Sequence, residues 1–169
     1  ADPLAEGADT LAPAKAWQAK KAAAGYACIT WPKAWGGQGG APMHNIIFSQ
    51  EEAKFPTPGN PFQIGLGMCV PTLMTFADDA TKERFGGPAI RGEEIWCQLF
   101  SEPDAGSDAA GIKARATRVE GGWLVNGPKV WTSGAHVAGI GFATVRTNPD
   151  APKHEGITTV VIDMHAEGV

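Results

Sequence analysis

Residues 100–111, FSEPDAGSDAAG, form a hydroxyl-rich and acidic segment directly after the apolar run EIWCQLF. Serine hydroxyls can hydrogen-bond a ligand, and glycine lets a backbone approach it closely because glycine has no side chain. The same residue types are also common in ordinary surface turns. The residues alone therefore leave open both a ligand-contacting loop and a plain turn.

A second hydroxyl-rich segment, VWTSGAH at residues 130–136, places Thr132 and Ser133 next to the indole of Trp131. Both segments end strand-like runs, and antiparallel pairing would bring the two ends together. A polar shelf beside an indole would suit a planar heteroaromatic ligand with hydrogen-bonding edges. Ser101, Thr132 and Ser133 are equally consistent with ordinary strand residues on a solvent-exposed face.

The sequence offers no familiar residue pattern for other chemistry. Glu102, Asp104 and Asp108 lie close together, but they miss the EF-hand spacing. Paired acid–base carboxylates are possible, although turn and capping roles are commoner. The four histidines form no HExxH pair, no GxSxG motif occurs, and the GGQGG loop lacks the Lys-Ser/Thr of a P-loop. We expect no metal site.

Composition narrows the class of protein. The net charge of −4 argues against a nucleic-acid binder, which usually has a basic face. No apolar run is long enough for a membrane-spanning helix, and the N-terminus does not read as a secretory signal. Cys28, Cys69 and Cys97 are odd in number and far apart, which favours reduced, buried thiols and a cytoplasmic location.

The first half of the chain predicts helices joined by glycine- and proline-rich turns. We expect helices over 12–25, ending at Gly25, and over 42–55, with Ile46, Ile47 and Phe55 on its apolar face. An apolar helix over 64–77 starts or is interrupted near Pro71, and a short helix follows an Asp cap and closes at Gly86 and Gly87.

The second half predicts strands near 94–102, 139–147 and 156–164. Residues 113–134 predict three strands, separated by a glycine turn at Gly121-Gly122 and a second turn at Asn126-Gly127. Asn126-Gly127 between apolar runs is the strongest hairpin signal, because both residues tolerate positive φ. Helices followed by antiparallel strands give an α+β chain, with a helical domain over 1–94 and a β-domain over 95–169. The final strand would leave an open sheet edge, so we expect the chain to be a fragment.

Three stretches together resemble the middle domain of the acyl-CoA dehydrogenase family: QLFSEPDAGSDAAGIKARA, GWLVNGPKVWTSGAH and RTNPDAPKHEGITTVVIDM. GYACITWPKAWGGQGG, QEEAKF and GLGMCVPTL are similar to the family's N-terminal helical domain. The resemblance covers nearly the whole chain and is strongest to actinobacterial members. It implies an all-helical domain followed by an antiparallel β-barrel or sandwich-like domain, truncated before a C-terminal helical bundle.

The resemblance also implies FAD as the cofactor. The residues matching the family's flavin-binding segments are Gln98, Phe100, Ser101, Gly106, Ser107, Trp131, Thr132 and Ser133. Ser107 and Gly67 match positions that contact the acyl-CoA substrate. Gly65 and Gly67 would leave room for a bulky acyl group. Pro128 stands where the family usually has Gln, which puts the local turn geometry in doubt.

The implied reaction is α,β-dehydrogenation of an acyl-CoA to the trans-2-enoyl-CoA, as in fatty acid β-oxidation. The family's catalytic glutamate lies in the C-terminal domain, so we assign no base in this chain. An electron-transfer flavoprotein as acceptor and a homotetramer or homodimer are further expectations. Three alternatives remain: an acyl-CoA oxidase, a flavin monooxygenase or nitroalkane oxidase of the same fold, or a non-catalytic subunit of a heteromeric enzyme. A plain binding module would require an accidental match.

Overall fold

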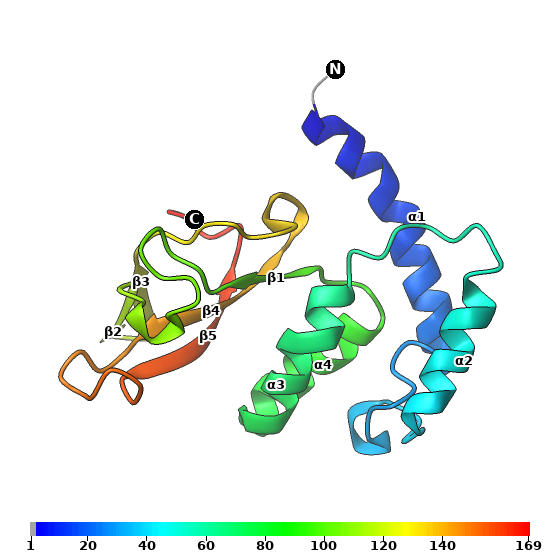
Figure 1. The fold of residues 1–169 in the computed structure, drawn as a ribbon, viewed down its shortest axis with the longest axis horizontal. Coiled ribbons are helices and arrows are strands. Elements are labelled where there is room, and N and C mark those ends of the chain that lie inside the picture. The colour runs from blue at the N-terminus through cyan, green and yellow to red at the C-terminus, as the bar shows by residue number, and fades with distance from the viewer. Residues whose placement is uncertain (1–2) are drawn as a thin grey trace. The chain divides into compact units, whose positions relative to one another are not determined.

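The computed structural model describes the backbone of residues 3–169 and the side chains of residues 11–169. The chain divides into two compact units, Ala1–Ile95 and Trp96–Val169 (Figure 1). Within the described residues, the first unit holds the α-helices and the second holds the strands. The predicted α+β class, with a helical first part and a β second part, is confirmed.

Helix α1 (Pro3–Ala23) ends as its sequence predicts, at a glycine. Gly25 has φ +80°, a left-handed conformation that favours glycine. The Tyr26 amide donates to the Lys21 carbonyl at 2.7 Å, and the Gly25 amide donates to the Ala22 carbonyl at 3.0 Å. These two bonds form the Schellman motif, which satisfies carbonyls at the helix end that have no intrahelical partner.

Helix α2 (Pro42–Glu52) has the predicted apolar face, but this face is exposed. Ile46 and Ile47 are 49% and 50% exposed, and no residue of α2 is buried. The predicted extension of the helix to Phe55 is wrong, because the helix ends at Glu52 and Phe55 lies beyond it, 67% exposed. The helix is joined to α1 by polar contacts instead, since the Trp17 indole donates to Glu52 at 2.8 Å. Amphipathic periodicity thus identified the helix without identifying what covers it.

Residues 65–76 form a continuous helical segment that begins with a widened turn. Gly65–Cys69 is π-helical and leads into α3 (Val70–Phe76). Widened turns of this kind are frequent at functional sites. The prediction of a helix that starts or is interrupted near Pro71 is confirmed.

Helix α4 (Asp79–Ile90) starts at the predicted Asp cap, where the Asp78 carboxylate accepts from the Thr81 amide at 2.7 Å. Its predicted end at Gly86 and Gly87 is wrong, because the helix continues to Ile90. A Cβ on Gly86 would lie 3.0 Å from the sulfur of Met74 in α3. The glycine therefore permits close packing of two helices rather than terminating one.

The second unit is a mixed sheet built around β4 (Ile140–Arg146). β1 (Trp96–Leu99) pairs with β4 in parallel, and β5 (Ile157–Asp163) pairs with it antiparallel. β2 (Arg115–Val119) and β3 (Gly122–Asn126) form an antiparallel hairpin. The expected β-domain is present, but its sheet is mixed and open rather than a wholly antiparallel barrel, because β1 and β2 both run parallel to β4.

β1 and β2 both pair with β4, one after the other. Trp96–Leu99 faces Ile140–Ala143, and Arg115 faces Arg146. Residues 100–114 lie between these two paired stretches. Over the same interval, the pairing positions on β4 move only from Ala143 to Arg146. The hydroxyl-rich segment is therefore a long excursion between two strands with a common partner, and its two ends must lie near each other.

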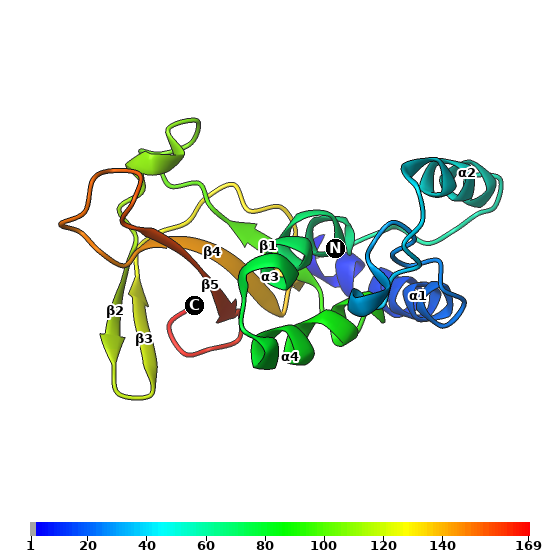
Figure 2. The ribbon, with the colours of Figure 1, turned by 90° about the horizontal axis from the view of Figure 1, so that it is seen from below.

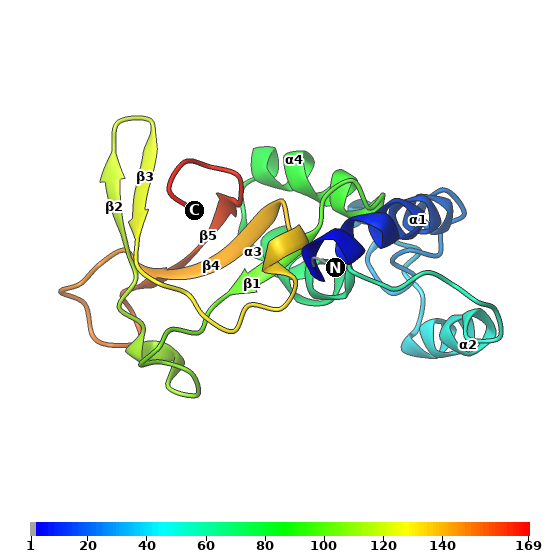
Figure 3. The same ribbon diagram turned by 90° about the horizontal axis from the view of Figure 1, so that it is seen from above.

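The hairpin predicted at Asn126-Gly127 does not form. The glycine turn predicted earlier in the same stretch is confirmed. It lies at Glu120-Gly121, between the paired residues Val119 and Gly122, and Figures 2 and 3 show the hairpin extending from the rest of the sheet. Gly127 has φ +142°, and a Cβ there would lie 2.6 Å from the Ala114 Cα. Close backbone approach, not a turn, explains this glycine. Pro128 is exposed and outside any strand, so its missing N–H breaks no ladder bond.

Candidate functional site

The two hydroxyl-rich segments lie side by side in the second unit. The Val130 amide donates to the Ser101 carbonyl at 2.9 Å, and the Lys129 ammonium donates to the Phe100 carbonyl at 3.1 Å. The predicted proximity of the segments is confirmed. The predicted antiparallel strand pairing is wrong, because residues 127–133 form no strand and these two bonds make the junction instead.

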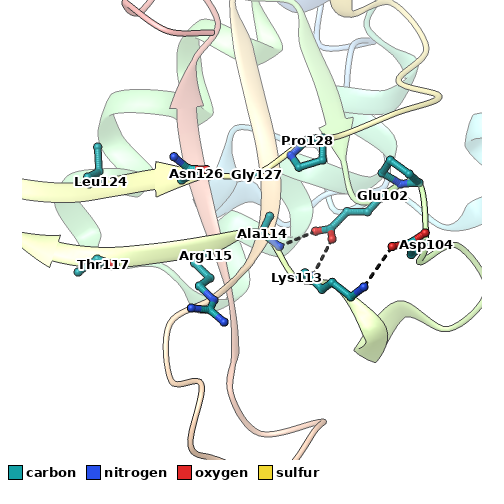
Figure 4. A pocket seen from close by; sticks show the side chains of 11 residues that line it. Glu102, Asp104, Lys113, Ala114, Arg115, Thr117, Leu124, Asn126, Gly127 and Pro128 are labelled. Carbon is teal, nitrogen blue, oxygen red and sulfur yellow. Dashed lines mark hydrogen bonds and ion pairs between the residues drawn. The ribbon is translucent and has the colours of Figure 1, made fainter.

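A buried carboxylate closes the neck of the excursion. Glu102 accepts from the amides of Lys113 at 2.6 Å and Ala114 at 3.0 Å, and from the Lys129 ammonium at 2.7 Å. Figure 4 shows the two amide contacts. Burial would raise the pKa of Glu102, but these hydrogen bonds outweigh it and hold the pKa below its usual value.

Peripheral contacts hold the excursion in place as well. Glu102 and Ala105 exchange two backbone hydrogen bonds across a tight turn. Arg146 on β4 donates to the carbonyls of Ala110 at 2.8 Å and Ile112 at 3.3 Å. The loop therefore has a defined backbone path from its start to its return.

The acidic side chains of this loop are engaged by cations. Asp104 pairs with Lys113 at 3.1 Å and Asp108 with Lys153 at 2.6 Å. The hydrogen bond from Lys153 holds the pKa of Asp108 below its usual value. No group of His, Cys, Asp or Glu within the described side chains could hold a metal ion. The three carboxylates thus act as ion-pair and turn residues rather than as an acid–base pair.

The tip of the loop is open. Gly106 and Ser107 are exposed, and a Cβ at Gly106 would meet nothing within 4 Å. At the base, Gln98 on β1 stands opposite Phe142 on β4, and the rings of Phe100 and Phe142 have centroids 6.4 Å apart. The residues predicted to bind flavin therefore extend from Gln98 on the sheet to the exposed Gly106 and Ser107 at the loop tip.

Trp131 has an unusual backbone conformation. Its φ is +58°, and no other non-glycine residue in the described chain has a positive φ. The side chain is 91% exposed. Bulky residues rarely adopt this region, and such strain clusters at functional sites.

The next two residues carry hydroxyls in different surroundings. The Thr132 hydroxyl oxygen is buried and has no hydrogen-bond partner within the described chain, whereas Ser133 is exposed. A buried hydroxyl without a partner costs free energy, so native proteins usually pair it. Thr132 also lines the cavity beside Trp131, so a polar group bound in that cavity is a candidate partner for this hydroxyl.

Two cavities flank the junction. One of about 630 Å³ is lined by Trp131, Thr132 and apolar side chains that include Leu99, Val145 and Ile162. The other, of about 490 Å³, lies between the Glu102 turn and the base of the hairpin (Figure 4). Gly67 belongs to the first unit, where it is exposed on the π-helical turn.

Sequence reasoning missed the residue that joins the segments. Lys129 lies two positions before Trp131, and Glu102 follows Ser101 directly. Their side chains come into contact only in the folded unit, so no local sequence pattern predicted the pair. The one usable signal was a lysine inside an otherwise apolar stretch, which suggests a partner because an unpaired buried ammonium is costly.

Family sequence models match both parts of the chain. The model described as acyl-CoA dehydrogenase, N-terminal domain, matches residues 2–93. The model described as acyl-CoA dehydrogenase, middle domain, matches residues 97–169. Together they account for nearly the whole sequence and confirm the resemblance.

Individual relatives of this chain point to the same family. Acyl-CoA dehydrogenase FadE34 of Mycobacterium tuberculosis is 44% identical over 139 residues, covering 82% of this chain and 19% of that protein. The solved structure of the Tcur3481-Tcur3483 steroid ACAD is 30% identical, with a TM-score of 0.80, covering 92% of this chain and 40% of that chain.

A third relative is the ChsE4-ChsE5 complex from Mycobacterium tuberculosis, with 34% identity and a TM-score of 0.79. The similarity covers 91% of this chain and 39% of that chain. This chain therefore spans between about a fifth and two fifths of the lengths of these relatives. On its sequence, its fold and both domain matches, the chain belongs to the acyl-CoA dehydrogenase family.

Proposed function

We propose that this chain is part of an FAD-dependent acyl-CoA dehydrogenase that converts an acyl-CoA thioester to the trans-2-enoyl-CoA. The observation that carries the proposal is the junction of the two hydroxyl-rich segments through Val130 and Ser101. It joins an exposed indole, hydroxyls and an open glycine-serine tip in one region of the β-domain. Family membership supplies the reaction class.

The residues of this region fit a flavin. A flat heteroaromatic ring would cover the exposed indole of Trp131, which is otherwise in water. Its polar edge would engage the buried Thr132 hydroxyl, which has no partner within the described residues. One ligand would thus account for two unusual features: the exposed, strained Trp131 and the Thr132 hydroxyl without a partner in the described residues.

Individual roles follow from position. Gln98, Phe100 and Ser101 would line the ring from the β1 side, with the Ser101 hydroxyl as hydrogen-bonding partner. Trp131 would pack against the ring, and Ser133 would hydrogen-bond its edge.

Gly106 and Ser107 would let the loop backbone approach cofactor and thioester closely, since nothing within 4 Å surrounds a Cβ at Gly106. Bound FAD supplies the hydride acceptor for the substrate β-carbon, and the protein's share is to orient substrate and cofactor.

The base that removes the substrate α-proton is proposed to lie outside these 169 residues. Glu102 is a poor candidate because its carboxylate already accepts from two amides and one ammonium. The same bonds favour its charged form and lower its pKa, which weakens it as a proton acceptor.

We further propose a bulky acyl group as substrate. Gly67 lies on the π-helical turn Gly65–Cys69, and a Cβ at Gly67 would meet nothing within 4 Å. One solved relative, Tcur3481-Tcur3483, is described as a steroid ACAD. Reaction with only the shortest acyl chains would contradict this substrate class.

An electron-transfer flavoprotein as acceptor and assembly into a homo-oligomer remain proposals. Two solved relatives carry the names of protein pairs, Tcur3481-Tcur3483 and ChsE4-ChsE5. These names favour pairing with a second, related chain as the alternative assembly. Mass measurement of the purified full-length protein, alone and after co-expression with related chains, separates the two arrangements.

The test is an anaerobic titration of the full-length protein with acyl-CoA thioesters of increasing size, following the absorbance of oxidised flavin. Bleaching by one class of thioester is expected. A bound flavin that no thioester bleaches would favour the oxidase or monooxygenase alternatives. A protein that purifies and reconstitutes without flavin would favour a non-catalytic subunit.

A further inference from the structure

The Lys129–Glu102 pair differs from the other ion pairs of the described chain by its burial. The two side chains are 9% and 4% exposed, with Nζ and Oε1 2.7 Å apart. The Lys113–Asp104 pair on the same loop is 75% exposed at both residues. An exposed ion pair contributes little to stability, whereas breaking a buried pair is strongly destabilising because it leaves an unpaired buried charge.

The buried pair connects three stretches of chain. Lys129 reaches the first segment at two oxygens, the Phe100 carbonyl and the Glu102 carboxylate. Glu102 in turn holds the returning end of the loop through the amides of Lys113 and Ala114. One carboxylate and one ammonium therefore set the start of the loop, its return and the second segment relative to each other.

An apolar pair of similar volume could stabilise this region equally well, because taking two charges out of water is costly. Apolar contacts are not directional, however, whereas these hydrogen bonds fix donor and acceptor positions. Directional control matters most beside a site whose groups must be held within about 0.5 Å. Both residues are close neighbours in sequence of such groups: Glu102 follows Ser101, and Lys129 precedes Trp131 by two positions.

We propose that Lys129 and Glu102 are positioning residues that fix the spacing between the two proposed flavin-binding segments. This inference rests on the proposed function, since it concerns the same site. Neither side chain contacts the cofactor in this proposal. They act through the backbone at the junction, where the Val130 amide donates to the Ser101 carbonyl at 2.9 Å.

The test compares Lys129→Met with Lys113→Met in the full-length protein. Both changes remove an ammonium from the same neighbourhood, but Lys113 pairs on the surface and its backbone amide contact with Glu102 survives the change. FAD is removed, and its affinity is measured by quenching of flavin fluorescence on rebinding. Lys129→Met is expected to weaken FAD binding by about tenfold to a hundredfold, and Lys113→Met by less than about twofold.

Two further readouts separate positioning from general destabilisation. The visible spectrum of bound flavin should shift in Lys129→Met but not in Lys113→Met, at a temperature well below both melting points. Lys129→Arg, which keeps a cation, should restore most of the affinity. If Lys129→Met does not fold, the FAD affinity and flavin spectrum of Lys129→Arg and Glu102→Gln provide the test. Wild-type affinity and spectrum in Glu102→Gln would overturn the proposal, as would wild-type values in Lys129→Met.

A third measurement does not depend on flavin. In the cofactor-free protein, hydrogen exchange at the Val130 amide should accelerate by about tenfold or more in Lys129→Met, because the junction opens more often. Unchanged exchange overturns the positioning role even if the flavin assignment stands. Conversely, a wild-type protein that binds no FAD overturns the proposed function, while the exchange result still reports on the junction.

Discussion

At the scale of single residues, Trp131 and Thr132 show how strain and desolvation mark a site. A left-handed backbone at a bulky residue and a buried hydroxyl without a partner in the described chain are each unfavourable in the protein alone. The two residues are adjacent in sequence, with the Trp131 side chain in water and the Thr132 hydroxyl buried. Contacts of the surrounding chain, including those of Lys129, must offset the free-energy cost of both features.

Glu102 gives a prediction about pH. Its folded-state pKa is below the unfolded value, so its stabilisation is fully present above the usual glutamate pKa and is lost as pH falls through the folded value. Glu102→Gln should lower the melting temperature of the full-length protein at pH 7, and the difference from wild type should shrink as the pH falls below about 4.5. The measurement is thermal unfolding from about pH 3.5 to pH 7.

The matched control is Asp104→Asn, which breaks the exposed pair with Lys113 on the same loop. It should change the melting temperature little at any pH, since exposed pairs contribute about 0–1 kcal/mol. A Glu102→Gln difference that stays constant with pH would show that the charge of Glu102 is not what stabilises the junction.

At the scale of elements, the end of α1 gives a prediction about glycine. Gly25→Ala should destabilise by about 1–2 kcal/mol, because φ is +80° there and an L-residue is strained in that region. Gly59→Ala is the control, since a Cβ at Gly59 meets nothing within 4 Å. Chemical denaturation compares the two variants, and equal midpoints would contradict the role of Gly25.

Elements whose signals are local could be predicted, and those decided by distant contacts could not. Gly25 and the Asp78 cap act on neighbouring amides and carbonyls, so sequence identified both. Asn126-Gly127 carried an equally strong local signal for a hairpin. There the close approach to Ala114 and the bond from Val130 to Ser101 prevailed, because both join residues distant in sequence.

For the candidate site, the resemblance named the residues, while the geometry that joins them came from the fold. Parallel pairing of β1 and β2 with β4 has no local signature, so sequence reasoning expected an antiparallel arrangement. The pair of Lys129 and Glu102 has none either, because its members are 27 positions apart. A buried charge inside an apolar stretch was the only hint.

At the scale of the whole molecule, exposed apolar side chains give a prediction about the isolated chain. Met43, Ile46 and Ile47 share one face of α2, and Leu124 on β3 is 62% exposed. Residues 1–169 expressed alone should therefore associate or aggregate rather than remain a 17.7 kDa monomer. Size-exclusion chromatography with light scattering tests this, and a monodisperse monomer would contradict it.

The same isolated chain should show no acyl-CoA-dependent dye reduction, because the proposed base lies outside it. Among the described residues, none of the helices has the length and apolar character of a membrane span. Activity in the isolated chain would place the base within these residues.

The route of the chain past β4 also bears on engineering and on divergence among relatives. Residues 103–112 are anchored at the neck by Glu102 and farther along by Arg146 and Lys153, while the strands before and after them pair with one partner strand. A replacement loop of different composition that keeps these three anchors is expected to change ligand preference. The pairing of β1 and β2 with β4 is expected to stay the same.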